Sequence, residues 1–158
     1  MNNILMCISC VLATLLLNIS SAYAFEDNSN FSFGVGIGPM YSGLGINAAY
    51  QSTDSIIYGS LGCVDKNSDD EACGLGIGYL NSTILNLGNK HALGAYVGIV
   101  GSEITNHKLK ENYGVNFSYN YFFKGISHSG ANVGVGISFE RNDDDIDPLL
   151  SVQIGYQF

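Results

Sequence analysis

Apolar side chains recur at every second position in a series of short segments from residue 31 to the end of the chain. The last segment shows the pattern most clearly, because Leu150, Val152 and Ile154 are followed at the same spacing by Tyr156 and Phe158. A period of two places successive side chains on opposite faces of a β-strand. The sequence therefore predicts an all-β chain whose eight strands lie around residues 31–37, 44–50, 57–63, 75–79, 93–99, 113–121, 133–139 and 150–158.

The two faces of these strands differ in composition. One face is aliphatic or aromatic, whereas the other carries Gly, Ser, Asn, Gln and some Tyr. Charged residues lie between the strands or at strand ends, as Glu111 and Glu140 do. A soluble sheet normally carries charged residues along its wet face. The pattern instead predicts an eight-stranded antiparallel up-and-down transmembrane β-barrel with an apolar outside and a crowded lumen of small residues. A secreted soluble ligand-binding β-barrel is the alternative.

The N-terminal segment has the features of an export signal. Residues 1–24 carry no charge and contain an apolar run from Ile4 to Leu17, followed by small residues that include Ala22 and Ala24. The run is shorter than the roughly 20 residues that a membrane-spanning helix requires. We therefore expect a signal peptide over 1–24 and a mature barrel domain over 25–158.

The charge of the chain limits its partners, and its cysteines predict a covalent link. The chain has 6 Lys and Arg against 14 Asp and Glu, for a net charge of −8. With no basic patch to neutralise phosphates, no nucleic-acid partner is expected. Cys63 and Cys73 flank a polar stretch, and in an exported chain this arrangement predicts a disulfide bond that staples a loop. A zinc site is the alternative, but no His lies nearby to complete it, and we assign no metal or cofactor.

An even number of strands places both termini on one side of the membrane, which export predicts to be the periplasm. The opposite connections would then face the cell exterior, and they hold most of the acidic residues. Acidic loops at a lipopolysaccharide surface can share divalent ions with lipid phosphates, and Asp143, Asp144, Asp145 and Asp147 are candidate oxygen ligands, with a simply solvated loop as the alternative. The predicted outer loops are Pro39–Gly43, Val64–Ala72, Gly101–Lys110 and Arg141–Pro148.

The final residues Gly155-Tyr156-Gln157-Phe158, preceded by alternating apolar positions, resemble the closing strand of small outer-membrane barrels of the OmpX/Ail and OmpA membrane-domain type. The resemblance implies a location in the outer membrane of a Gram-negative cell, among its lipids and lipopolysaccharide. It also implies insertion by the outer-membrane assembly machinery, with Tyr156 and Phe158 as the assembly signal. Such barrels often carry Gly at the position that Gln153 occupies here. They include adhesins, structural proteins and lipid-modifying enzymes.

The strongest catalytic candidate is Ser127-His128-Ser129, with Glu140 further along the chain. Some outer-membrane lipid A deacylases use His, Ser and Glu on barrel strands, and nucleophilic catalysis requires His beside the serine and a carboxylate that orients it. Those enzymes place His and Ser two positions apart on one strand face, whereas Gly130 stands at that position here. The sequence favours a polar turn, and hence a structural or surface-interaction role with no catalytic residues. A lipid A-modifying enzyme is the alternative, and no surface ligand is indicated.

Overall fold

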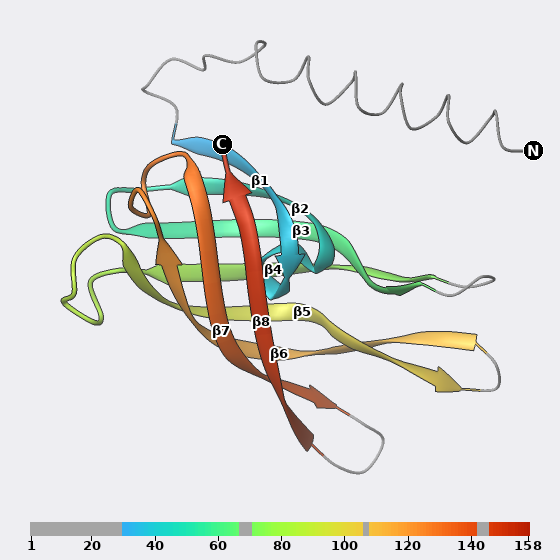
Figure 1. Cartoon of the computed structure of the whole chain (residues 1–158). Helices are drawn as coiled ribbons and strands as arrows, with labels where there is room; N and C mark the ends of the chain where they lie inside the picture. The colour runs from blue at the N-terminus through green and yellow to red at the C-terminus, as the bar shows by residue number, and fades with distance from the viewer. Residues whose placement is uncertain (1–29, 67–70, 106–107, 142–145) are drawn as a thin grey trace, which may run out of the picture.

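Eight antiparallel strands close into a barrel in which each strand pairs with its neighbours in chain order (Figure 1). The computed structural model describes residues 30–66, 71–105, 108–141 and 146–158. The predicted all-β, up-and-down barrel is confirmed, while the predicted signal peptide lies outside the described residues. The strands are β1 Phe31–Gly38, β2 Gly43–Gln51, β3 Ser55–Lys66, β4 Glu71–Asn81, β5 His91–Thr105, β6 Lys108–Phe122, β7 Gly130–Arg141 and β8 Ile146–Gln157.

No helix in the described part of the chain is long and apolar enough to cross a membrane.

Three hairpins extend beyond the end of the barrel that lies away from the C-terminus (Figure 1). They are β3–β4, β5–β6 and β7–β8, and their strands continue well into the segments that the sequence predicted as loops. The β5–β6 ladder, for example, continues to the pair Thr105 and Lys108. The alternation of apolar residues stops earlier than the ladder because a hairpin with water on both faces can carry polar side chains on either side.

The fourth strand ends where an asparagine side chain takes over the backbone hydrogen bonding. The Oδ1 atom of Asn81 accepts hydrogen bonds from the backbone N–H groups of Thr83 at 2.9 Å and Ile84 at 3.2 Å. Such a side-chain turn competes with the sheet ladder. Leu85 and Leu87 keep the alternate spacing of the apolar residues in this strand, but both lie in the connection after β4.

The first hairpin differs from the other three because its turn folds into the barrel. A single turn of 3-10 helix, η1 (Pro39–Tyr41), buries Met40 and Tyr41, which are 1% and 0% exposed. Gly38 and Gly43 flank this turn with φ angles of 117° and 95°, a backbone region that strongly favours glycine. The sequence predicted only a short outer loop here, whereas the segment is part of the barrel filling.

The inward-facing glycines provide the space that the lumen's aromatic rings occupy. The rings of Tyr58 and Tyr96 stack with centroids 6.4 Å apart. A Cβ atom added at Gly76 would meet the Tyr96 ring, and one added at Gly78 would meet the Tyr58 ring. Gly76 and Gly78 therefore leave no water-filled space in the lumen, because tyrosine rings pack against them.

This packing predicts that Gly76→Val destabilises the barrel while Gly59→Val does not. Overpacking a filled interior costs about 1–3 kcal/mol, whereas Gly59 lies on the outer face, where the nearest atom to an added Cβ is 4.0 Å away. Urea unfolding of both variants in detergent micelles measures the difference. Equal stabilities of the two variants would contradict the account of the lumen.

Candidate functional site

The outer surface of the barrel is a continuous belt of exposed apolar side chains. Leu150 is 76% exposed, Val152 67% and Phe117 57%. Charged residues of the described strands lie only beyond this belt, towards the hairpin tips, as Asp65 and Glu71 do. We call this surface the apolar belt; it comprises Phe33, Val35, Ile37, Leu44, Ile46, Ile57, Leu61, Leu75, Ile77, Val97, Phe117, Val135, Ile137, Leu150, Val152 and Ile154.

Aromatic side chains border the apolar belt at the end of the barrel that holds the C-terminus. Tyr50 packs edge-to-face on Phe31 with centroids 5.5 Å apart, and its hydroxyl accepts a hydrogen bond from Asn30 Nδ2 at 2.8 Å. The hydroxyl of Tyr119 lies 2.6 Å from Nδ1 of His91. Rings with an apolar body and a polar tip are typical of a membrane–water boundary.

One aromatic residue near the end of β6 faces the lumen instead of the outside. The sequence predicts lipid contact and an interfacial girdle for Tyr113, Phe117, Tyr119, Tyr121, Phe122 and Phe123. Phe117 and Phe123 are exposed on the outside, but Phe122 is 2% exposed and packs inside the barrel. It belongs to the buried apolar cluster of the lumen, which also includes Met40 and Tyr41 of η1. The prediction of an outward Phe122 was wrong because two adjacent aromatic residues cannot both point outward from a regular strand. The cluster also contains Ile56, Leu80, Ala92 and Ile126.

Polar side chains fill the middle of the lumen and bond to one another. Tyr41 Oη donates to Asn132 Oδ1 at 3.2 Å and accepts from Asn132 Nδ2 at 2.8 Å. The Ser42 hydroxyl lies 2.7 Å from the Ser60 hydroxyl and 2.9 Å from that of Tyr96. These contacts fix η1 and the adjoining Ser42 to three different strands, β7, β3 and β5.

A second group of amides links the strands that close the barrel. Gln153 Nε2 donates to Asn120 Oδ1 at 2.6 Å, while Gln157 Nε2 donates to Ser32 Oγ at 2.8 Å and to Asn47 Oδ1 at 3.0 Å. Both glutamines lie on β8 and point inward, and Gln157 stands between Tyr156 and Phe158 of the predicted assembly signal. Gln153, the departure from the common Gly, is therefore a lumen residue that ties β8 to β6.

The predicted disulfide bond is present between Cys63 and Cys73. The two residues are a directly opposed pair of β3 and β4, with Cα atoms 3.9 Å apart. Within the described residues, Cys63, Glu71 and Cys73 form one grouping of metal-ligating atoms, but sulfurs joined in a disulfide are not the thiolates that zinc binds. The bond holds the base of the β3–β4 hairpin closed.

The structure separates the residues of the candidate catalytic group. Ser127 Oγ lies 3.2 Å from His128 Nδ1 in the exposed turn between β6 and β7. Glu140 lies at the opposite end of β7, where a Cβ added at Gly101 would meet its carboxylate. The described residues of this turn thus bring no carboxylate to His128. The acidic residues Asp143 to Asp145, proposed as cation ligands, lie outside the described residues.

Comparison of the chain with protein family models, curated proteins and solved structures gave no match.

The lumen contacts predict that Tyr41→Phe destabilises the barrel. Loss of the hydroxyl leaves both ends of the buried Asn132 amide without this partner, and an unsatisfied buried polar group costs about 1–3 kcal/mol. Tyr156→Phe removes the same atom from a side chain that is 40% exposed on the outside and is expected to be neutral. Denaturant unfolding compares the two variants, and a neutral Tyr41→Phe would show that the contact does not hold η1.

Proposed function

We propose that this protein is an integral outer-membrane β-barrel whose role is structural or surface interaction. The observation that carries the proposal is the apolar belt, which encircles a closed sheet and is bordered by aromatic residues with polar tips. Soluble monomers rarely expose contiguous apolar patches larger than a few hundred square ångströms. A closed barrel leaves no sheet edge along most of its wall, as backbone burial in hydrocarbon requires.

The length of the strands supports a membrane crossing. Transmembrane β-strands need about 9–11 tilted residues, and β2 and β4 contain 9 and 11 residues. The alternative of a soluble ligand-binding barrel requires a core on one face of the sheet. The lumen does contain a packed interior, but the outer face would then expose large side chains such as Leu150 and Ile77 to water without a cover.

The proposed surroundings follow from the position of the charges. The β3–β4 and β5–β6 hairpins carry exposed acidic side chains, including Asp65, Glu71 and Glu111. We propose that the three extended hairpins lie at the outer surface among lipopolysaccharide headgroups. Insertion would proceed through β8, whose Tyr156 and Phe158 rings lie 4.9 Å apart on the outside. The outer-membrane assembly machinery is the proposed partner for that step.

Membrane fractionation of cells that express the full chain tests the proposal. We expect the protein in the outer-membrane fraction, resistant to salt and alkaline extraction, with a gel mobility that changes on heating because a closed barrel resists unfolding in detergent. Recovery of folded protein in a soluble fraction would instead support the secreted ligand-binding barrel.

Phe117→Arg tests the lipid-facing surface directly. A charged side chain near the bilayer midplane of a barrel costs about 2–4 kcal/mol, so refolding into phospholipid vesicles should become less favourable by that amount. Ser129→Arg is the matched control, because Ser129 is exposed in the β6–β7 turn. The proposal fails if both variants insert as well as the parent protein does.

A further inference from the structure

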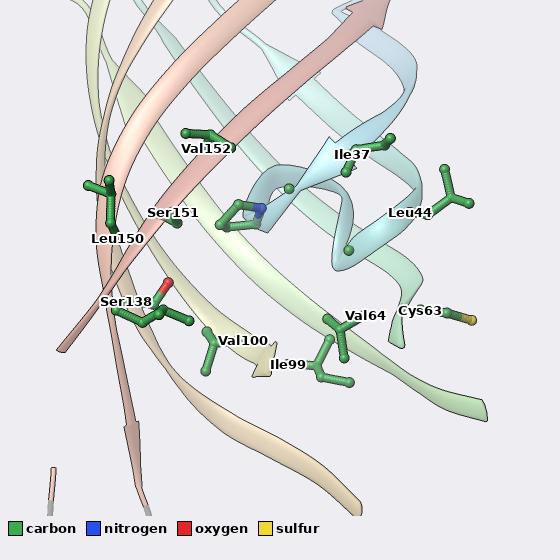
Figure 2. Close-up of a pocket in the computed structure, with 14 residues that line it drawn as sticks. Ile37, Leu44, Cys63, Val64, Ile99, Val100, Ser138, Leu150, Ser151 and Val152 are labelled. Atoms are coloured by element: carbon green, nitrogen blue, oxygen red, sulfur yellow. The ribbon is translucent and has the colours of Figure 1, made fainter. Parts of the chain in front are cut away.

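A cavity of about 300 Å³ opens through the barrel wall between β3 and β8 (Figure 2). We call it the side notch and define it by Ile37, Leu44, Val64, Leu150 and Val152 around its mouth, with Ile99 and Val100 of β5 lining it from within. Ile99 is only 1% exposed, so its side chain is buried from the outer surface of the barrel and lines the side notch from within.

The side notch exists because the β1–β2 hairpin is shorter than its neighbours. β8 pairs with β7 as far as Ile146, but its pairing with β1 ends at Ile154. On the other side, β3 continues to Lys66 although its pairing with β2 ends at Cys63. The wall is therefore missing above the hairpin turn, and η1 closes the space below because Pro39 lines the cavity and Met40 and Tyr41 are buried beside it.

The lining is apolar apart from two serines. Ser138 and Ser151 Oγ both accept hydrogen bonds from Asn116 Nδ2, at 2.9 and 2.6 Å. Because both hydroxyls act as acceptors in these bonds, each can still donate its own hydrogen to another acceptor. Apolar walls with a few convergent polar groups are typical of small-molecule sites, whose volumes start at about 300 Å³.

The mouth of the side notch belongs to the apolar belt. Ile37 and Leu44 are 55% and 64% exposed, and Val152 on the facing strand is 67% exposed. The mouth therefore opens sideways onto the surface proposed to contact lipid. It also lies near the outer limit of that surface, because Asp65 comes two residues after Cys63.

We propose that the side notch binds one acyl chain of an outer-leaflet lipid, which enters sideways from the membrane. This inference rests on the proposed membrane location. Hydrocarbon matches the lining of Val64, Ile99 and Val100, and the volume suits a single chain better than a whole lipid. The backbone edge of β8 at the mouth needs hydrogen-bond partners in a membrane, and the ester carbonyl of the bound chain supplies an acceptor there and for Ser151.

Photo-crosslinking in vesicles tests this site. The full chain, folded in phosphatidylcholine vesicles that contain a phospholipid with a diazirine on one acyl chain, is irradiated, digested and mapped by mass spectrometry. We expect adducts at Ile99 or Val100 in addition to those at the exposed belt residues Val97 and Phe117. An adduct at Ile99 requires a chain inside the cavity because this residue is buried from the outside.

Filling the cavity provides the matched variants. Val100→Phe on β5 and Val64→Phe on β3 should each abolish the adduct at Ile99, while the belt adducts remain. Val97→Phe adds the same bulk on the outer face and should leave the Ile99 adduct unchanged. Each variant is first checked for heat-dependent gel mobility, so that only folded protein is compared.

The outcomes separate this inference from the proposed function. Belt adducts without any at Ile99 or Val100 would overturn the acyl-chain site and leave the membrane barrel in place. Absence of adducts at the belt in folded protein would overturn the membrane location, and the acyl-chain site with it.

Discussion

The hydrogen-bonded contact between β1 and β8 is the constraint on which the rest of the structure depends, since it turns a sheet into a barrel. It is short, joining Gly34–Ile37 to Ile154–Gln157, and it is extended by the bond from Phe158 N to Phe33 O at 2.7 Å. Its closure leaves a narrow interior that eight strands can fill with side chains. The inward Gly residues, the three buried tyrosines and the amides of β6 and β8 are consequences of that limited space.

The same contact explains why η1 folds inward. A hairpin that ends at Gly38 leaves the outer part of the lumen without a wall on one side, and Met40 and Tyr41 fill it from within. The contacts of Tyr41 with Asn132 and of Ser42 with Ser60 and Tyr96 then attach the turn to β7, β3 and β5. The inward turn that fills this end of the lumen and the side notch are thus two results of one short hairpin.

The period-two pattern was sufficient to predict the strand number, the order and the outward face. It was insufficient for η1. A five-residue connection that contains Pro39 and is flanked by glycines has no periodicity that shows whether the turn folds into the barrel or away from it. It also failed at Phe122, because two successive aromatic residues do not show which of them faces outward. The strand extensions in the three extended hairpins were not predicted, because polar residues beyond the belt follow no alternation. The disulfide was predictable because the predicted export and the polar spacer both favour pairing of Cys63 with Cys73.

The central claim is that the apolar belt lies in hydrocarbon, and a single tryptophan tests it most directly. The chain contains no Trp, so Val97→Trp reports its own surroundings without background. In protein folded into vesicles, we expect strong quenching of its fluorescence by phospholipids with brominated acyl chains and little quenching by acrylamide in water. Free quenching by acrylamide and none by brominated chains, in protein that is shown to be folded, would contradict the account and favour a soluble barrel.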